Sequence, residues 1–289
     1  MVHIFNGFAI WSVVGNSLPL VAIIKYEALH KPVYILMANL AASDIVAGVS
    51  FIITCTTTYF HAKAEIYLPI TLVRVLFTST VLSVLSSTYS LLALTAERYW
   101  FIVHGMTYEN NITNDRCKIV IIIVWMWSSI LALLPAFGWS CNYPSDLGCI
   151  QFGGGSQPGY LVMILILVFI PMLAIMIFNL GVFRCLWQQV SDIRRQEAAV
   201  QAPPSTSRKS AVTILIITVA FLVGWLPWCT AIAIEVACKE DCGNVDPTML
   251  AFVILNSAIN PIIYGFRLEE IRRNVKRVFV GGPLIAWSP

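Results

Sequence analysis

The sequence predicts an all-α membrane protein, a bundle of seven transmembrane helices. Hydrophobic residues make up 58% of the 289 residues and charged residues only 11%, whereas an ordinary soluble domain carries about 25% charged residues. The mean hydropathy of +0.79 agrees with a chain surrounded by lipid. A helix needs about 20 residues to cross the hydrocarbon core of a bilayer, and seven apolar stretches reach that length. They lie at about residues 4–24, 33–60, 70–103, 117–138, 159–187, 210–236 and 247–266.

The same composition excludes several other classes of protein. Disordered chains, small disulfide scaffolds and nucleic-acid binders all differ from it in polarity, cysteine content or basic patches. The first stretch begins close to Met1 without a basic n-region, so we expect it to span the membrane and not to act as a secretory signal. No internal repeat is visible, and residues 1–289 are expected to form a single domain.

The basic residues predict how the spans are oriented. All 18 Lys and Arg residues except Lys63, Arg74 and Lys239 fall on one side of the predicted membrane. In multi-pass proteins the cytoplasmic loops carry the excess of Lys and Arg. We therefore expect a multi-pass protein of the plasma membrane with its amino terminus outside and its carboxyl terminus in the cytoplasm.

Four of the eight cysteines fall in predicted outer loops. Cys141 and Cys149 follow the fourth span, and Cys238 and Cys242 follow the sixth. Disulfides persist on the oxidising side of a membrane. The placement agrees with the orientation and predicts disulfides in both loops.

Asp44 lies in the middle of the second span, where an ionisable residue is costly and usually faces the interior of the bundle. One interpretation is a carboxyl group that is hydrogen-bonded to neighbouring helices or protonated. The other is a cation site, with sodium as the expected ion, because the third and seventh spans offer polar ligands at inward-facing spacings. These ligands are Ser83, Ser87, Asn256, Ser257 and Asn260.

Three short motifs stand at span ends or next to prolines. Glu97, Arg98 and Tyr99 end the third span, where such residues also occur simply as interfacial side chains. In the seventh span Pro261 frees a backbone carbonyl, and Asn260 is available to satisfy it. The sixth span contains two bulky aromatic residues, Phe221 and Trp225, beside a kink at Pro227.

Together with Asn16, Trp125 and residues 40–44, these motifs form one ordered set that resembles the rhodopsin-like (class A) G-protein-coupled receptors. The resemblance covers all seven spans. A short amphipathic segment at residues 268–279 is similar to the family's interfacial eighth helix. The resemblance therefore implies a seven-transmembrane helix bundle with a short amphipathic eighth helix, no enzymatic activity, and no cofactor apart from an allosteric sodium ion.

The resemblance also implies roles for individual residues. Arg98 engages a heterotrimeric G protein, Trp225 senses the ligand, and Tyr264 swings inward on activation. The full coupling and switch set is Glu97, Arg98, Tyr99, Met106, Phe221, Trp225, Pro227, Asn260, Pro261 and Tyr264. The implied sodium ligands are Asp44, Ser87, Asn256, Ser257 and Asn260. Arrestin and membrane lipids are further candidate partners.

Within the family, the chain is most similar to the lysophospholipid receptors, with the cannabinoid receptors as neighbours. The similar segments are residues 30–34, 138–141 and 255–261, and no cysteine lies near Val73 or Arg74 at the outer end of the third span. The resemblance implies that Cys141 pairs within its own loop. It also implies an extracellular lipid mediator, such as sphingosine 1-phosphate or lysophosphatidic acid, as the ligand.

One departure from that branch concerns the ligand headgroup. Leu76 and Phe77 occupy the positions where lysophospholipid receptors hold the phosphate with an arginine and an acid or amide. Arg74 is a candidate replacement, with Lys63 as a second candidate, although an interfacial side chain at position 74 is an equal alternative. The residues expected to line the ligand pocket are Arg74, Phe77, Thr80, Trp225, Trp228, Ile232 and Leu250.

Other departures and alternatives remain open at this stage. Ser207, Arg208 and Lys209 stand where many relatives carry a glutamate that restrains Arg98, which predicts appreciable basal signalling. The ligand alternatives are an endocannabinoid-like lipid, a nucleoside, or activity without any ligand. An ion or solute transporter is the more distant alternative, since an acid in mid-membrane is also typical of that class.

Overall fold

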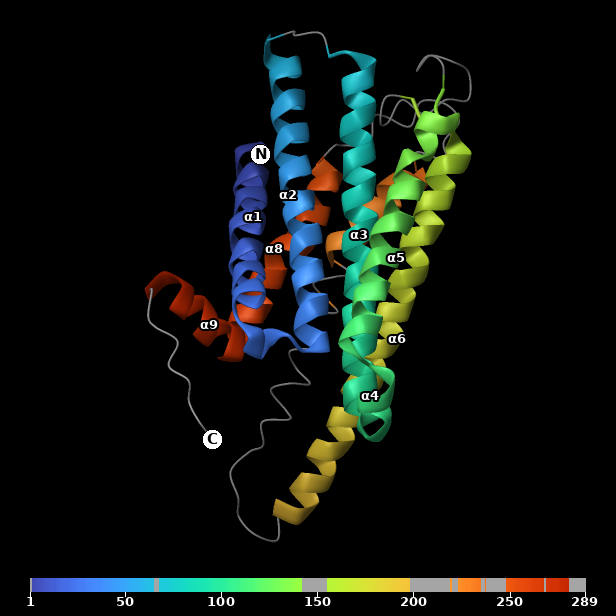
Figure 1. Ribbon diagram of the computed structural model, residues 1–289. Coiled ribbons are helices and arrows are strands. Elements are labelled where there is room, and N and C mark those ends of the chain that lie inside the picture. Colours follow the sequence, from blue (N-terminus) through green and yellow to red (C-terminus); the bar gives the residue numbers. More distant parts are fainter. Residues whose placement is uncertain are drawn as a thin grey trace.

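The computed structural model describes residues 2–64, 68–141, 155–197, 223–234, 248–267 and 269–280, together with residues 219 and 237. Figure 1 shows long helices lying side by side along a common axis, with the short α4 and α9 at one end of the bundle. The described spans agree with the predicted all-α bundle. Within these ranges β-structure is limited to one isolated bridge between Ser140 and Ser156.

The long helices coincide with the predicted spans. They are α1 (Val2–Lys25), α2 (Pro32–Ala64), α3 (Ile70–Val103), α5 (Asn114–Leu133), α6 (Pro158–Glu197) and α8 (Thr248–Arg267). The short elements are η1 (Glu27–Leu29), α4 (Gly105–Asn111), η2 (Leu134–Phe137) and α9 (Glu269–Val280). Five described helices are long and apolar enough to cross a membrane, and two shorter apolar helices, Val223–Ile234 and Phe252–Ile263, belong to the sixth and seventh predicted spans.

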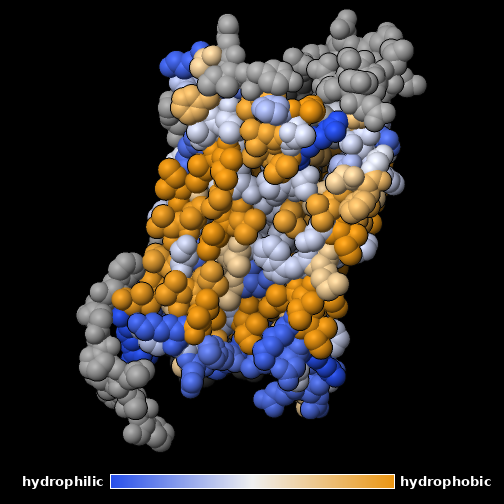
Figure 2. All heavy atoms as spheres, turned by 45° about the horizontal axis from the view of Figure 1, so that its top comes forward, coloured by the Kyte–Doolittle hydropathy of each residue, from blue (hydrophilic) through white to orange (hydrophobic). Residues whose placement is uncertain are grey.

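The outer surface of the bundle is apolar, as expected for helices that face lipid. On α1 the side chains of Ile10, Val14 and Ile24 are 54%, 53% and 68% exposed. Figure 2 shows hydrophobic side chains covering the middle of the molecule on the face in view, with hydrophilic side chains gathered at one end. A water-soluble protein rarely exposes so large an apolar area.

Small residues bring the first helix close to its neighbours. A Cβ atom on Gly48 of α2 would lie 2.7 Å from a methyl group of Val13, and one on Gly15 of α1 would lie 2.8 Å from Cγ of Pro261. Helices in membranes associate largely through such close contacts, because lipid provides no hydrophobic drive between them. These glycines therefore hold α1 against both α2 and α8.

Buried polar side chains tie α3 and α5 to α2. Asn39 of α2 donates to Oγ of Ser90 on α3 at 2.7 Å and accepts a 2.8 Å hydrogen bond from the indole N–H of Trp125 on α5. Each of these groups would be costly to leave unpaired inside a bilayer. The amide of Asn39 thus fixes the relative placement of α2, α3 and α5.

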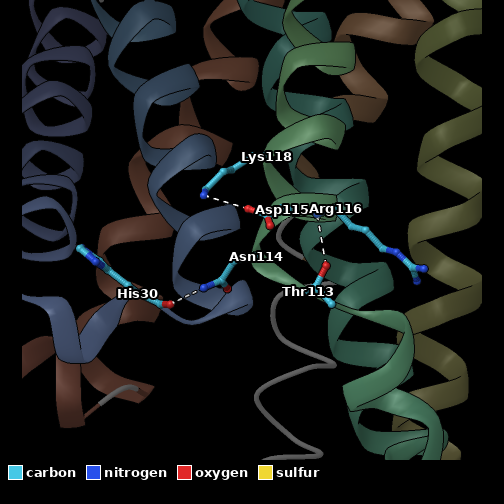
Figure 3. A network of polar contacts seen from close by, with 6 residues as sticks. All are labelled: His30, Thr113, Asn114, Asp115, Arg116 and Lys118. Atoms are coloured by element: carbon cyan, nitrogen blue, oxygen red, sulfur yellow. Dashed lines mark hydrogen bonds and ion pairs between the residues drawn. The ribbon is translucent and has the colours of Figure 1, made fainter.

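A second polar network joins the turn after α1 to the start of α5 (Figure 3). Asn114 donates a 2.9 Å hydrogen bond to the backbone carbonyl of His30. Thr113 caps α5 by accepting from the backbone N–H of Arg116 at 3.4 Å. The exposed ion pair between Lys118 and Asp115, at 3.1 Å, adds little because water screens it.

The helix α9 follows α8 and lies beside the end of α1 (Figure 1). It covers almost the same residues as the segment predicted to form an amphipathic eighth helix. Ile271 and Asn274 are buried, whereas Arg272, Arg273, Lys276 and Arg277 are exposed. Tyr34 at the start of α2 donates a hydrogen bond to the carboxylate of Glu270. The placement of α9 at a membrane surface stays a prediction.

Candidate functional site

The centre of the bundle contains a buried carboxyl group held by two other helices. Asp44 of α2 is fully buried. Its Oδ1 accepts a 2.9 Å hydrogen bond from Ser87 of α3, and its Oδ2 accepts a 2.7 Å hydrogen bond from Asn260 of α8. The side chain of Ser257 is also hydrogen-bonded to it. Among the residues that the structure describes, no cationic side chain pairs with Asp44.

A small cavity of about 30 Å³ lies next to this carboxyl group. Ser50, Ser83, Ser87, Asn256 and Ser257 line it with polar atoms. The cavity is about large enough for a single water-sized particle. Oxygen ligands suit a hard cation, and a buried carboxylate needs a positive partner or a proton. The residues present therefore fit a sodium ion, which supplies that positive charge when bound.

The predicted sodium ligands fall into two groups. Ser87, Ser257 and Asn260 contact Asp44 directly. Asn256 instead packs on Gly224 of the Val223–Ile234 helix, where a Cβ atom would lie 2.7 Å from the amide oxygen of Asn256. The Nδ2 atom of Asn256 is buried without a hydrogen-bond partner. Asn256 thus joins the cavity to the sixth predicted span.

Trp225 closes the same cavity from the Val223–Ile234 helix. It is 3% exposed and packs edge-on against Trp228, with the ring centroids 5.8 Å apart. Trp228 and Ile232, which are predicted to line the ligand pocket, are buried in the same hydrophobic core as Trp225. Phe221 and the side chains of Leu250 and Tyr264, which the sequence assigns to the pocket and the switch, lie outside the described residues.

The carbonyl freed by the proline of the seventh span has a different partner from the one predicted. Pro261 cannot donate to the carbonyl of Ser257 four residues earlier. Asn16 of α1 donates to that carbonyl at 3.0 Å, while Asn260, the predicted partner, is bonded to Asp44. The prediction for Asn260 was wrong because an amide next to Pro261 on the same helix points toward α2 and not along its own backbone.

At the other end of α3, the Glu97 carboxyl group is bound by a residue that the sequence analysis did not identify. Glu97 is 4% exposed, and Tyr108 of α4 donates a 2.5 Å hydrogen bond to its Oε1. The other oxygen, Oε2, has no partner. Burial, together with the hydrogen bond to Glu97 and the charge of that carboxyl group, raises the pKa of Tyr108 above its ordinary value. The sequence does contain one indication of this contact, because Tyr108 follows the end of the third span by only a few residues.

Arg98 and its neighbours form the surface expected to contact a G protein. Arg98 is half-buried and makes no hydrogen bond or ion pair with the described part of the chain. Tyr99 packs against Gly181 of α6, where a Cβ atom would lie 2.6 Å from the tyrosine ring. It also packs against Phe178, with the two ring centroids 5.2 Å apart. Met106 on α4 is fully exposed. Arg98 and Met106 are both available on this end of the bundle.

At the outer end of α3, Arg74 has a role that neither sequence interpretation contained. Its guanidinium donates a 2.6 Å hydrogen bond to the backbone carbonyl of Cys141 in the loop after α5. Cys141 is itself disulfide-bonded, although Cys149, Cys238 and Cys242 lie outside the described residues. Arg74 thus links the loop to the helix that, in this chain, carries no cysteine at its outer end.

Of the other predicted pocket residues near this end, Phe77 is apolar and Thr80 is hydrogen-bonded to the backbone of its own helix. Phe77 packs edge-on against Tyr160 of α6, with the centroids 6.4 Å apart. Thr80 lines the small cavity and donates to the backbone carbonyl of Leu76 at 2.9 Å. Among the described residues, no group of three or more His, Cys, Asp or Glu side chains is placed to hold a metal ion.

Comparison with known protein families identifies the fold. The pattern described as "7 transmembrane receptor (rhodopsin family)" matches residues 15–264, which is most of the chain and runs from within the first span to within the seventh. The chain belongs to the rhodopsin family of seven-transmembrane receptors. As a member of this family it is a multi-pass membrane receptor that couples to G proteins and is not an enzyme, and the transporter alternative is therefore wrong.

Among curated proteins, the receptor is similar to lysophosphatidic acid receptors. It is 26% identical over 270 residues to "Lysophosphatidic acid receptor 1" of Mus musculus and of Homo sapiens, and in both cases the match covers 93% of this chain and 73% of the relative. It is also 26% identical over 275 residues to "Lysophosphatidic acid receptor 3" of Homo sapiens, covering 94% of this chain and 76% of the relative. The predicted resemblance to the lysophospholipid branch is confirmed.

Proposed function

We propose that this receptor responds to an extracellular lysophospholipid-like lipid and converts its binding into activation of a heterotrimeric G protein. The observation that carries the proposal is the 26% identity over 93% of the chain to receptors named for lysophosphatidic acid. In the proposed orientation the amino terminus is outside and α9 is cytoplasmic, since the basic residues gather on the α9 side of the membrane.

The polar core gives this proposal a mechanism. A ligand that enters the outer half of the bundle presses on Trp225, which touches the small cavity and packs on Trp228. Movement of Trp225 reaches Asn256 through Gly224 and then the Asp44 cluster. A ligand that binds one packing of the bundle better than the other shifts the population toward it. A sodium ion at Asp44 favours the resting packing, so ligand and ion oppose each other.

The cytoplasmic end supplies the surface for the G protein. Arg98 is held by no partner within the described ranges, and Glu97, its neighbour, is bound by Tyr108 instead. Met106 presents a fully exposed hydrophobic side chain on the adjacent α4. An exposed large apolar side chain beside an arginine is typical of a protein interface.

Arg74 is the proposed contact for the lipid headgroup. A guanidinium carries five N–H donors, so the bond to the Cys141 carbonyl is compatible with a second bond to a phosphate. Arg74 also lies at the outer end of α3, two residues before the positions where the branch usually holds the phosphate. A phosphate bound by Arg74 would therefore lie close to the loop that carries Cys141.

The test is a matched pair of ligands that differ only in the phosphate. Lysophosphatidic acid and the monoacylglycerol with the same acyl chain are assayed for G-protein activation in cells that express the receptor, alongside sphingosine 1-phosphate. We expect the phosphate lipids to activate and Arg74→Ala to weaken them by about 10- to 100-fold, since a hydrogen bond to a charged group contributes about 1.5–3 kcal/mol. Lys63→Ala, which removes the second candidate cation near the outer end of α2, shows whether the effect belongs to Arg74.

Two outcomes would overturn the headgroup assignment. In the first, Arg74→Ala weakens G-protein activation by the phosphate lipid and by the monoacylglycerol equally. Arg74 would then have only its role in holding Cys141. In the second, a fatty-acid amide activates the receptor while phosphate lipids do not. The apolar pair Leu76 and Phe77 favours this second candidate function, a receptor for an endocannabinoid-like lipid. A nucleoside is included in the panel as the remaining alternative.

A further inference from the structure

A second and larger hollow lies away from the polar core, between α1, α8 and α9. Its volume is about 420 Å³, within the range of about 300–1,000 Å³ that is usual for small-molecule sites. Trp11 and Leu18 of α1, Ile262 of α8 and Val275 of α9 form its walls. Its floor is the close contact of Gly15 with Pro261. We refer to this hollow as the α1–α9 groove.

The walls of the α1–α9 groove are apolar. The indole N–H of Trp11 is already used, because it donates to the backbone carbonyl of Ala258 at 2.9 Å. Trp11 is nevertheless 46% exposed, and its neighbour Val14 is 53% exposed. The groove is therefore continuous with the lipid-facing surface of α1 and is suited to hydrocarbon.

Two cations border this apolar groove. Arg272 and Lys276 line it and are four residues apart on α9, so they lie on one face of that helix. Both side chains are exposed. The carboxylate of Glu270, on the turn before them, is hydrogen-bonded to Tyr34 of α2. The rim of the groove thus carries positive charge above an apolar floor.

We propose that the α1–α9 groove binds a membrane phospholipid with an anionic headgroup, whose acyl chain lies against Trp11 and Leu18 and whose phosphate is held by Arg272 and Lys276. An apolar hollow with a pair of cations at its rim matches the two parts of such a lipid. A second copy of the receptor would bring its own apolar, lipid-facing helices to this surface and would offer no phosphate to the two cations. The lipid matches both features.

The position of the groove connects this lipid to the switch region. Its wall includes Pro261 and Ile262, which follow directly after Asn260, the residue bonded to Asp44. A lipid that fills the groove in one packing of α8 better than in the other shifts the balance between them. The site differs from the agonist pocket, and its existence does not depend on which agonist the receptor binds.

The test measures lipid binding to the full chain purified in detergent, by native mass spectrometry. The probes are phosphatidylglycerol and phosphatidylcholine with identical acyl chains. We expect the wild-type receptor to retain phosphatidylglycerol more tightly. The double variant Arg272→Gln/Lys276→Gln is expected to lose roughly tenfold or more of that affinity, as two contacts to a charged group are removed.

The matched control is Arg273→Gln/Arg277→Gln, which removes two charges from the same helix outside the groove lining. We expect its affinity to change less than about threefold. A separate variant, Val275→Phe, keeps both cations but fills the groove, and is expected to weaken both lipids. Thermal unfolding of each variant verifies that it is folded.

Three results would overturn the proposal. Equal losses in the two double variants would show only general attraction between charges. Equal binding of the two lipids to the wild type would remove the role of the cations. Concentration-dependent dimers that disappear with Val275→Phe, without any bound lipid, would assign the groove to a second copy of the chain.

Discussion

Tyr108 of α4 is hydrogen-bonded to Glu97 of α3, which places a neutral phenol, and not the adjacent arginine, on the acidic residue of the coupling motif. Glu97 is buried, and its second oxygen has no partner. Because Tyr108 supplies the hydrogen bond to the Glu97 carboxyl group, Arg98 is not held by it. The contact therefore favours the state in which Arg98 is available to a G protein.

Replacement of Tyr108 by Phe is expected to lower basal G-protein activation. Without the phenol, Arg98 becomes the available donor for the buried carboxylate, and the resting state gains a contact worth about 1.5–3 kcal/mol. Nucleotide exchange on purified G protein in the absence of ligand measures the effect. Tyr26→Phe, which removes a phenol oxygen at the same end of the bundle and keeps the ring beside Lys25, serves as the control. An unchanged basal rate in Tyr108→Phe would contradict the proposed release of Arg98.

The same contact has a defined pH dependence. Since the folded-state pKa of Tyr108 is raised, first by burial and then by the bond to Glu97, its contribution to stability is complete below the ordinary tyrosine pKa of about 10. It is lost only as the pH rises from that value through the folded-state pKa. We expect the difference in melting temperature between wild type and Tyr108→Phe to be constant from neutral pH to about pH 10 and to shrink above it. A difference that already declines near pH 8 would argue against this contact.

Sodium is expected to stabilise the receptor through Asp44. Ligand binding to the folded state alone contributes about 1.4 kcal/mol when the ion is at ten times its dissociation constant. Melting curves in sodium chloride and in choline chloride of equal ionic strength measure this effect. In Asp44→Asn the neutral amide should abolish the sodium dependence, whereas Ser86→Ala should retain it, because Ser86 is a buried hydroxyl of α3 that bonds to the Ser83 carbonyl and does not line the cavity. A sodium effect that persists in Asp44→Asn would exclude the site.

Gly224 is expected to tolerate no side chain. A Cβ atom there would collide with the amide of Asn256, and overpacking of this kind usually costs about 1–3 kcal/mol. Gly224→Ala should therefore lower the melting temperature and reduce the agonist response, because Asn256 is pushed toward the cavity beside Asp44. Gly7→Ala is the matched control, since nothing lies within 4 Å of a Cβ atom at that position in α1. Equal behaviour of the two variants would show that the contact of Gly224 with Asn256 is unimportant.

Trp125 is expected to stabilise the folded receptor through its N–H group and not only through the packing of its ring. Trp125→Phe leaves the side-chain oxygen of Asn39 without its donor, and an unsatisfied buried acceptor costs about 1–3 kcal/mol. Trp127→Phe on the same helix changes the same atoms, but its side chain is 43% exposed. We expect Trp125→Phe to lower the melting temperature and Trp127→Phe to leave it almost unchanged. Similar losses would assign the effect to ring size alone.

The sequence predicts the spans and most of the Asp44 cluster, because an acid inside an apolar stretch has to face the bundle and amides on inward faces must meet it. It does not predict which residue of another helix completes a contact. The partners of Arg74 and of the Ser257 carbonyl lie 67 and 241 residues away in the chain. Spacing along one helix carries no information about the rotation of its neighbour. For the same reason, Asn256 and Ser83 line the cavity but do not bind Asp44.

The contact between Asn16 and the Ser257 carbonyl leads to a prediction about a pair of residues. Asn16 compensates for the hydrogen bond that Pro261 removes from α8. Asn16→Ala alone should therefore cost about 1–3 kcal/mol, because a carbonyl is left unpaired in the bilayer. In a Pro261→Ala background residue 261 supplies its own N–H to that carbonyl, and the cost of Asn16→Ala should fall.

A double-mutant cycle on melting temperatures and unfolding free energies measures this coupling, which we expect to be about 1 kcal/mol. Ser17→Ala provides the control cycle, because Ser17 donates to the carbonyl of Val13 within its own helix at 2.7 Å. Ser17→Ala and Pro261→Ala should be additive. If Asn16→Ala and Pro261→Ala are also additive, Asn16 stabilises α1 through its bond to Ser12 and the compensation for the proline must come from elsewhere.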